Sequence, residues 1–438
     1  MTYADPSDLV RGGEVHRDLF VDQKLFDQEM SNLFANCWVY VGHESQVPKR
    51  GDYYATTIGS QPVIMVRQKD GTVKVIYNRC PHRGVQLVNE GHGSVGPMFR
   101  CPYHAWTFNT DGSLFGVPVK DGYKESGFSE SCASHGIEGV ATHVYRQFVF
   151  ARLAREGIGF EEFFGESLTT IDNMVDRSPE GRLEVAGAPL RYMHYCNWKM
   201  LVDNQTDTFH PMIAHESSAG TVRKIWEESG AQGPKPMVVE VVLPFTAKHE
   251  FYVEMGIRTW PNGHGHTGTK YSIHSDYTLP KEYTDAMEAA YGAERAEAIL
   301  QEARHNTVYF PNMTMKGAIQ TLRLFKPLGP DRTLVESWVF RLAGAPDELL
   351  ERSALYNRLI NSPTSIVGHD DLEMYERAQQ GLKVSATPWV NYQREFHPGE
   401  RYDSTQLWSG QSEVQMRNQY DAWVKFMKPA VSGEEVQA

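Results

Sequence analysis

The first part of the chain carries apolar side chains at helical intervals. In residues 17–36 they recur at Leu19, Phe20, Leu25, Phe26, Met30, Leu33 and Phe34. A spacing of three and four residues places such side chains on one face of a helix. We therefore predict that residues 1–37 form an N-terminal helical segment that packs on the C-terminal domain of the chain.

Between residues 38 and 155 the pattern changes to short β-rich runs. Examples are PVIMVRQ (62–68), TVKVIYN (72–78) and FVFARL (148–153), with glycine, aspartate and proline between them. Short apolar runs separated by turn-forming residues are typical of antiparallel strands. This region is predicted to be a small antiparallel β domain.

Residues 156–438 mix strand-like and helical patterns. PMVVEVVLPF (236–245) and HEFYVEMGI (249–257) are predicted as strands, whereas the segment 281–305 has helical periodicity. Strands and segregated helices predict an α+β domain with a central antiparallel sheet. The polar tail, about Ser432 to Ala438, is predicted to fray.

Composition excludes several classes of function. Of the 438 residues 41% are hydrophobic and 22% charged, and the printed sequence has no run of 18 apolar residues that could span a bilayer. The N-terminus lacks the features of a secretory signal, so a cytoplasmic protein is expected. The net charge of −12 is spread without a basic stripe, which argues against nucleic-acid binding.

Two of the five cysteines belong to a paired motif with histidines. Cys80 and His82 form C-x-H, and Cys101 and His104 form C-x-x-H. Such a set can hold a single structural zinc ion, or a two-iron cluster in which cysteines bind one iron and histidines the other. The remaining cysteines, which have no such partners, are predicted to be buried and inert: Cys37, Cys132 and Cys196.

Two glycine-rich stretches fit the G-x-G-x-x-G pattern of nucleotide-binding loops. They are residues 91–96 and 263–268. Neither opens a helix after a strand, so both are predicted to be turns, and nicotinamide or flavin binding is assigned to another protein.

A second possible metal site lies further along the chain. His210 and His215 are five residues apart, which on a regular helix separates them by about 140°, so the backbone must deviate between them, and Pro211 is the expected cause. Two histidines and one carboxylate would leave open positions on ferrous iron, although the same residues could be satisfied polar groups on a helix surface. Spacing alone leaves three candidates for the carboxylate: Asp370, Asp371 and Glu373.

Together the two motifs resemble those of the α subunits of Rieske non-haem iron ring-hydroxylating oxygenases, over residues 34–425. The family pattern Asp-x-x-His-x-x-x-x-His matches Asp207, His210 and His215, and the register of residues 370–379 implies Asp371 as the third ligand. The resemblance implies a Rieske [2Fe-2S] domain at 38–155 and a catalytic domain of the helix-grip type with a mononuclear Fe(II) at 156–438.

The resemblance also implies roles for residues around the iron. Asp203 stands where many relatives carry an asparagine near the iron, and Val367 where they often carry a bulky aromatic residue. Asn204, Phe310 and Asn312 are implied as possible pocket residues. Two arginines, each more typical of a structural position, are candidates to hold a substrate carboxylate: Arg323 and Arg341.

The implied reaction uses O2 and electrons from a reductase or ferredoxin to hydroxylate an aromatic substrate, expected to be a benzoate- or salicylate-like acid. Asp207, three residues before His210 on an expected helix, would link it to His104 of a neighbouring subunit, in an α3β3 or α3 assembly. Two inserted oxygen atoms give a cis-dihydrodiol and one gives a phenol or a dealkylated product. The alternatives are a monooxygenase or demethylase on the same scaffold, an electron-carrying Rieske protein and a zinc module.

Overall fold

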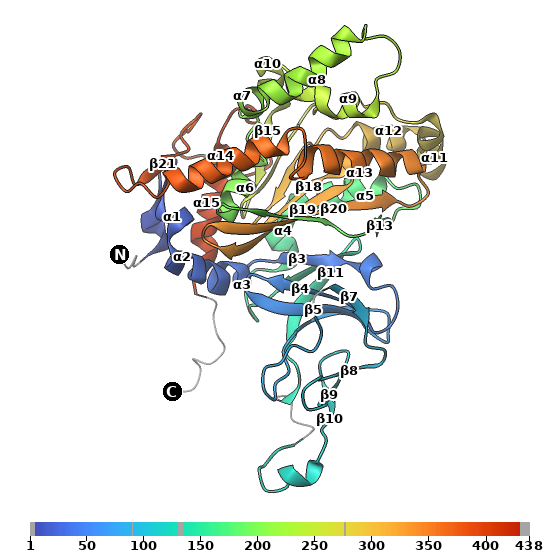
Figure 1. Cartoon of the computed structure of the whole chain (residues 1–438), viewed down its shortest axis with the longest axis vertical. Helices are drawn as coiled ribbons and strands as arrows, with labels where there is room; N and C mark the ends of the chain where they lie inside the picture. Colours follow the sequence, from blue (N-terminus) through green and yellow to red (C-terminus); the bar gives the residue numbers. More distant parts are fainter. Residues whose placement is uncertain (1–4, 90, 130–134, 276, 430–438) are drawn as a thin grey trace. The chain divides into compact units, whose positions relative to one another are not determined.

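The computed structural model describes residues 5–89, 91–129, 135–275 and 277–429. The chain divides into two compact units, each described here by itself (Figure 1). One contains the N-terminal segment up to Glu29 together with Glu161–Lys428, and the other is Met30–Phe160. The divisions therefore fall about five to eight residues from the expected boundaries after residues 37 and 155.

The unit Met30–Phe160 is built from antiparallel strands, as its β-rich runs predict. One sheet has seven strands and a smaller one has three. The run 62–68 forms a strand whose Val63, Ile64 and Met65 are fully buried, so both faces of this strand are covered. The strands are β3 (Val39–His43), β4 (Asp52–Ile58), β5 (Gln61–Arg67), β6 (Val73–Tyr77), β7 (Gly91–Ser94), β8 (Met98–Arg100), β9 (Thr107–Asn109), β10 (Leu114–Gly116), β11 (Gly139–Tyr145) and β12 (Phe148–Arg152).

The second unit is organised around an eight-stranded antiparallel sheet. Its longest strands form the β19–β20 hairpin, and β20 also pairs with β13 and β14. The sheet then continues through β18, β17 and β16 to β15. The strands are β13 (Leu183–Val185), β14 (Leu190–His194), β15 (Ile257–Trp260), β16 (His264–Thr267), β17 (Thr307–Tyr309), β18 (Met313–Lys316), β19 (Thr321–Gly329) and β20 (Arg332–Leu342).

Helices pack against this sheet, so the predicted α+β class is confirmed. Helix α13 contacts β20 (Figure 1), and α15 contacts β15 and β16. The helices of this unit are α1 (Asp18–Val21), α2 (Gln23–Gln28), α4 (Phe160–Phe164), α5 (Thr169–Asp176), α6 (Trp198–Asn204), α7 (Pro211–Ala214), α8 (Glu216–Glu228), α9 (Met237–Val242), α10 (His249–Met255), α11 (Lys281–Tyr291), α12 (Ala293–Gln301), α13 (Asp347–Asn361), α14 (Gly368–Gly381) and α15 (Val414–Phe426).

The predicted N-terminal helix is present but broken. Asp22 ends α1 and caps α2, because its carboxylate accepts hydrogen bonds from two backbone amides at the start of α2. The π-helical turn Glu29–Leu33 and α3 (Phe34–Asn36) follow. Before these helices, β2 (Glu14–His16) pairs with β1 (Val10–Arg11) and β21 (Trp389–Asn391).

The sequence predictions for four segments are wrong. The runs 236–245 and 249–257 contain helices α9 and α10, since a short apolar run suits a buried helix as well as a strand. The two glycine-rich stretches contain strands β7 and β16 rather than turns. A Cβ at Gly93 would lie 2.4 Å from the Tyr53 hydroxyl, so this glycine permits close packing within a sheet.

Among the residues that the structure describes, no helix is long and apolar enough to cross a membrane. Cys37 and Cys196 are buried, as predicted, and neither forms a disulfide with another described cysteine. Cys132 lies outside the described residues.

Candidate functional site

The paired cysteine and histidine motifs lie on two loops with similar backbone hydrogen bonds. In the first, between β6 and β7, the amide of Gly84 donates to the carbonyl of Cys80; in the second, between β8 and β9, the amide of Ala105 donates to that of Cys101. Gly84 and Ala105 both have positive φ, so each loop turns sharply after its histidine. Both cysteines are buried in the core of this unit.

The histidines of these loops present nitrogens that lack partners. The rings of His82 and His104 lie 4.7 Å apart between centroids, and the Nδ1 atom of each is buried without a hydrogen-bond partner. Trp106 stacks on the His82 ring at 4.9 Å and holds its orientation. Burial, and the adjacent Cys101 thiol, raise the pKa of Cys80, which would favour a neutral thiol unless a metal binds the thiolate.

The spread of these four donors suits a two-iron cluster better than one zinc ion. Within the described ranges, no three of them lie within 4.8 Å of one another. Four ligands at about 2.0–2.3 Å from a single tetrahedral zinc would lie closer together than that. Two irons, with the cysteines on one and the histidines on the other, span a longer distance.

His210, His215 and Asp371 come together in the other unit. Their ligand atoms all lie within 4.8 Å of one another, and no other group of three or more His, Cys, Asp or Glu residues does so in the described part of the chain. The Oδ1 atom of Asp371 is 3.6 Å from the Nε2 atom of each histidine. Two imidazoles and one carboxylate converging on one point are the donors of a facial triad.

The backbone deviation that the histidine spacing requires is present. His210 precedes the four-residue helix α7, which begins at Pro211, and His215 stands at its junction with α8. Pro211 therefore begins a short helix instead of interrupting a long one, as suits proline at the first helical position. The two rings end 5.3 Å apart between centroids and nearly perpendicular.

Two further carboxylates lie behind the histidines. Asp370 Oδ2 is 3.2 Å from His215 Nδ1 and accepts a hydrogen bond from Ser218 at 2.8 Å. Asp207 Oδ2 is 3.6 Å from His210 Nδ1. Each carboxylate thus faces the ring nitrogen opposite the triad, where it can fix the tautomer of a metal-binding histidine.

The position of Asp207 does not come from a helix, contrary to the prediction. Helix α6 ends at Asn204, and Asp207 instead accepts a hydrogen bond from the amide of Phe209 at 2.9 Å in a tight turn. Burial alone would raise the pKa of Asp207, but His210, Phe209 and Arg394 lower it below its ordinary value. The carboxylate is therefore charged at neutral pH.

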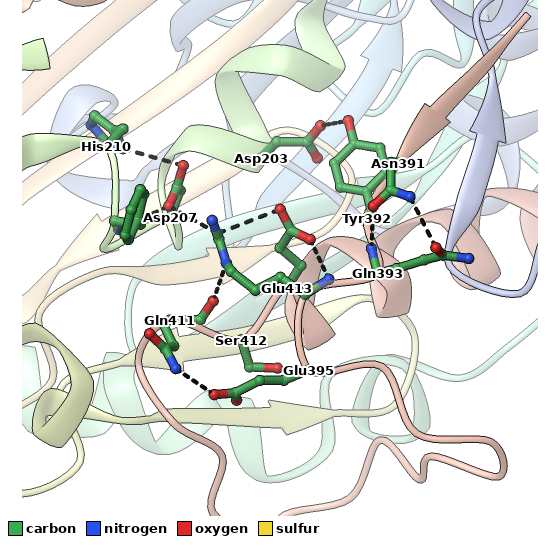
Figure 2. Close-up of polar contacts among 12 residues, drawn as sticks. Asp203, Asp207, His210, Asn391, Tyr392, Gln393, Glu395, Gln411, Ser412 and Glu413 are labelled. Atoms are coloured by element: carbon green, nitrogen blue, oxygen red, sulfur yellow. Dashed lines mark hydrogen bonds and ion pairs between the residues drawn. The ribbon is translucent and has the colours of Figure 1, made fainter. Parts of the chain in front are cut away.

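Asp203 does not lie at the triad, so that expectation is wrong. Its carboxylate accepts hydrogen bonds from Tyr392 at 2.8 Å and Tyr420 at 2.6 Å, and Figure 2 shows it turned toward Tyr392. The next residue takes that place: the amide nitrogen of Asn204 is 3.1 Å from His210 Nε2 and 3.4 Å from Asp371 Oδ1. One step along helix α6 turns a side chain by about 100°, which separates these two neighbours.

The triad lines a cavity that is partly open to solvent. Asn204 and Val367 also line it, whereas Phe310 and Asn312 do not. Phe310 packs near Trp198, and the side chain of Asn312 donates to the carbonyl of Phe325, so both are structural. Apolar and aromatic side chains form much of the remaining wall: Phe245, Tyr252, Met255, Ile273, Tyr356, Ile360, Leu372 and Tyr375.

The two candidate arginines have different surroundings. Arg341 is exposed and forms an ion pair with Asp347. Arg323 lines the cavity, where it donates to Gln205 at 3.2 Å and to the Tyr192 hydroxyl at 3.3 Å. Only Arg323 of these two can meet a ligand beside the triad.

Sequence reasoning missed a group of charged residues around Asp207. Arg394 lies 3.6 Å from the carboxylate of Asp207 and 3.4 Å from that of Glu413. Figure 2 shows that Asp207 is also turned toward His210. Arg394 and Glu413 lie 187 and 206 residues beyond Asp207 in the chain and carry no motif. No signal in a single sequence could have found them.

Both units match known protein families. Residues 37–128 match the Rieske [2Fe-2S] domain, and residues 183–429 match the catalytic domain of the ring hydroxylating alpha subunit. The two motifs found in the sequence fall inside these two matches.

Individual relatives agree with these family matches. The chain is 32% identical to toluate 1,2-dioxygenase subunit alpha of Pseudomonas putida over 84% of this chain and 78% of the relative. It is 30% identical to the 2-halobenzoate 1,2-dioxygenase large subunit of Burkholderia cepacia, over 86% and 79% of the two chains. Its fold is similar to naphthalene 1,2-dioxygenase with indole bound, with a TM-score of 0.77 and 23% identity over 96% and 93% of the chains.

Proposed function

We propose that this chain, which belongs to the ring-hydroxylating oxygenase α-subunit family, inserts oxygen from O2 into an aromatic carboxylic acid. As a member of that family it is an oxidoreductase with a Rieske [2Fe-2S] cluster and a mononuclear iron. The observation that carries the proposal is the convergence of His210, His215 and Asp371 at the wall of a cavity that polar side chains and aromatic or aliphatic side chains line together.

The residues present fit both cofactors. The cluster would be held by Cys80, His82, Cys101 and His104. The Nδ1 atoms of the two histidines, which are buried without a hydrogen-bond partner, would bind one of its irons. The triad would hold Fe(II), and the side-chain NH2 group of Asn204 donates a hydrogen bond to the triad carboxylate of Asp371. When bound, the iron supplies the binding and activation of O2, with electrons delivered through the cluster.

The protein's own side chains orient the reactants and exclude water. Asp370 and Asp207 hold the two histidine rings with Nε2 toward the metal position. The apolar wall desolvates an aromatic ring and keeps it beside the triad. The half-buried positive charge of Arg323 favours an anionic substrate in the same space.

Relatives support an acid as substrate. The toluate and 2-halobenzoate dioxygenases are named for aromatic acids, and each aligns with more than four fifths of this chain. An external reductase or ferredoxin would supply the electrons. A β subunit and an α3β3 or α3 ring, in which Asp207 meets His104 of a neighbouring subunit, are part of the same proposal.

A single-turnover experiment tests the reaction. The anaerobic protein, reduced beforehand, is mixed with ¹⁸O2 and benzoate, salicylate or a neutral aromatic compound, and products are identified by mass spectrometry. Two labelled oxygen atoms in a product of an acid are expected. One labelled atom would point to the monooxygenase or demethylase reaction, and no product, with the cluster reducible and the iron site loaded, would refute the proposal.

A further inference from the structure

Two cations of the cavity lie on the same face of the large sheet. Arg323 on β19 pairs in register with Thr314 on β18, and Lys316 is two residues further along β18. Side chains two residues apart on a strand point to the same face, and so do those of directly paired residues. Both Lys316 and Arg323 line the cavity that contains the triad.

Neither cation is in direct contact with a carboxylate in the described part of the chain, although the charge of Asp371 acts on Arg323 from a greater distance. Lys316 is only 7% exposed, and among the described residues neither side chain has a carboxylate within 4 Å. The Nε atom of Arg323 is also buried without a hydrogen-bond partner. A buried lysine beside a half-buried arginine loses hydration and is repelled by its neighbour, which disfavours its charged form unless an anion neutralises the pair. The lysine elsewhere in this sheet, Lys326, does have such a partner, Glu336.

Two buried histidines orient Lys316. Its ammonium group lies 3.4 Å from His305 Nε2, and His305 Nδ1 lies 3.2 Å from His274 Nε2. If the lysine donates, His305 must carry its proton on Nδ1 and donate to His274 in turn. Burial and the nearby charge of Lys316 lower the pKa of both histidines well below its ordinary value, so neutral rings support the lysine.

We propose that Lys316 and Arg323 form an anion subsite that binds the carboxylate of the substrate, with His305 and His274 as positioning residues for Lys316. The subsite rests on the proposed function for its choice of ligand, an aromatic monocarboxylate, and it explains why two cations without a carboxylate in direct contact lie on one wall of the cavity. Burial, with Arg323 close by, lowers the pKa of Lys316 well below its ordinary value in the empty cavity. A bound carboxylate reverses that effect and restores the charged form.

Ligand binding without turnover tests the subsite. The assembled protein, with both cofactors and under anaerobic conditions, is titrated with benzoate and with benzamide, a neutral compound of similar shape, by isothermal calorimetry. Lys316→Met should weaken benzoate binding about tenfold or more, since a hydrogen bond to a charged group is lost, and should change benzamide binding much less. Lys316→Arg should retain most of the preference for benzoate.

Matched variants separate charge from folding. Arg341→Met removes an exposed arginine of the same sheet and should leave both affinities unchanged. The visible spectrum of the cluster and the melting temperature establish that each variant is folded, and Lys316→Gln serves if the methionine variant is not. An unchanged ratio of benzoate to benzamide affinity in the folded variants would overturn the subsite.

The same titrations distinguish failure of the subsite from failure of the proposed function. Benzoate binding that depends on Lys316, without any labelled product in the single-turnover experiment, would support the subsite and refute the reaction. Labelled product formed equally well from benzamide and benzoate, in wild type and in Lys316→Met, would support the reaction and refute the subsite.

Discussion

Replacing Asp370 by asparagine tests how the three acids at the start of α14 divide their roles. Asp371 converges with both histidines, Asp370 lies behind His215, and Glu373 is exposed and paired with Arg377. Asp370→Asn keeps an oxygen that can accept from His215 Nδ1 but removes the negative charge that makes the ring a better ligand.

The contacts of Asp370 set the expected loss of iron affinity in Asp370→Asn. Asp370 accepts from His215 at 3.2 Å and from Ser218 at 2.8 Å, so it is held in place and only its charge is lost. Loss of such an outer partner typically weakens metal binding about 10–100-fold, or about 1.4–2.8 kcal/mol. Asp371→Asn, which replaces a charged carboxylate ligand by a neutral amide, should weaken iron binding further, and Glu373→Gln should have no effect.

The assay is anaerobic titration of the iron-free mononuclear site with Fe(II) against a competing chelator. The cluster spectrum, which should be the same in all three variants, reports folding of the other unit. The order of affinity expected is wild type equal to Glu373→Gln, then Asp370→Asn, then Asp371→Asn.

Wild-type affinity in Asp370→Asn would refute the argument that the charge behind His215 strengthens the site. Equal loss in Asp370→Asn and Glu373→Gln would also refute it, because a general effect of charge on helix α14 would then be sufficient.

Three further variants test other parts of the same unit. Asp207→Asn should slow product formation in a single turnover about 10–100-fold at full iron loading, since the charge facing His210 is lost; an unchanged rate measured by rapid quench would contradict this. Glu29→Gln should lower the free energy of unfolding by about 3–5 kcal/mol in urea titrations, because it leaves the buried Lys199 without its counter-charge. Burial raises the pKa of Asp203 from 3.8 to about 7, so the folded state binds the proton more tightly than the unfolded state does. Stability should therefore fall as the pH is raised from about 4 to about 7. In urea titrations the midpoint of Asp203→Asn should fall less steeply over that range than the midpoint of the wild type.

The family and the chemistry of both metal sites could be predicted from the sequence, because they depend on residue types at short, fixed spacings. Cys80, His82, Cys101 and His104 carry one motif and Asp207, His210 and His215 the other. The helices 17–36 and 281–305 and the β-rich runs before residue 155 also followed from their periodicity, because an amphipathic pattern acts locally.

Only the tertiary structure decided the third ligand of the triad and the residues that share its cavity, because these features depend on residues far apart in the chain. Spacing could not choose among Asp370, Asp371 and Glu373, since the direction of each side chain depends on how α14 packs beside α7 and α8. Local spacing likewise could not show that Asn204, rather than Asp203, lies beside the triad. Lys316 and Arg323 share a cavity because β18 and β19 pair in one register, and strand register is set by long-range contacts that no local pattern records.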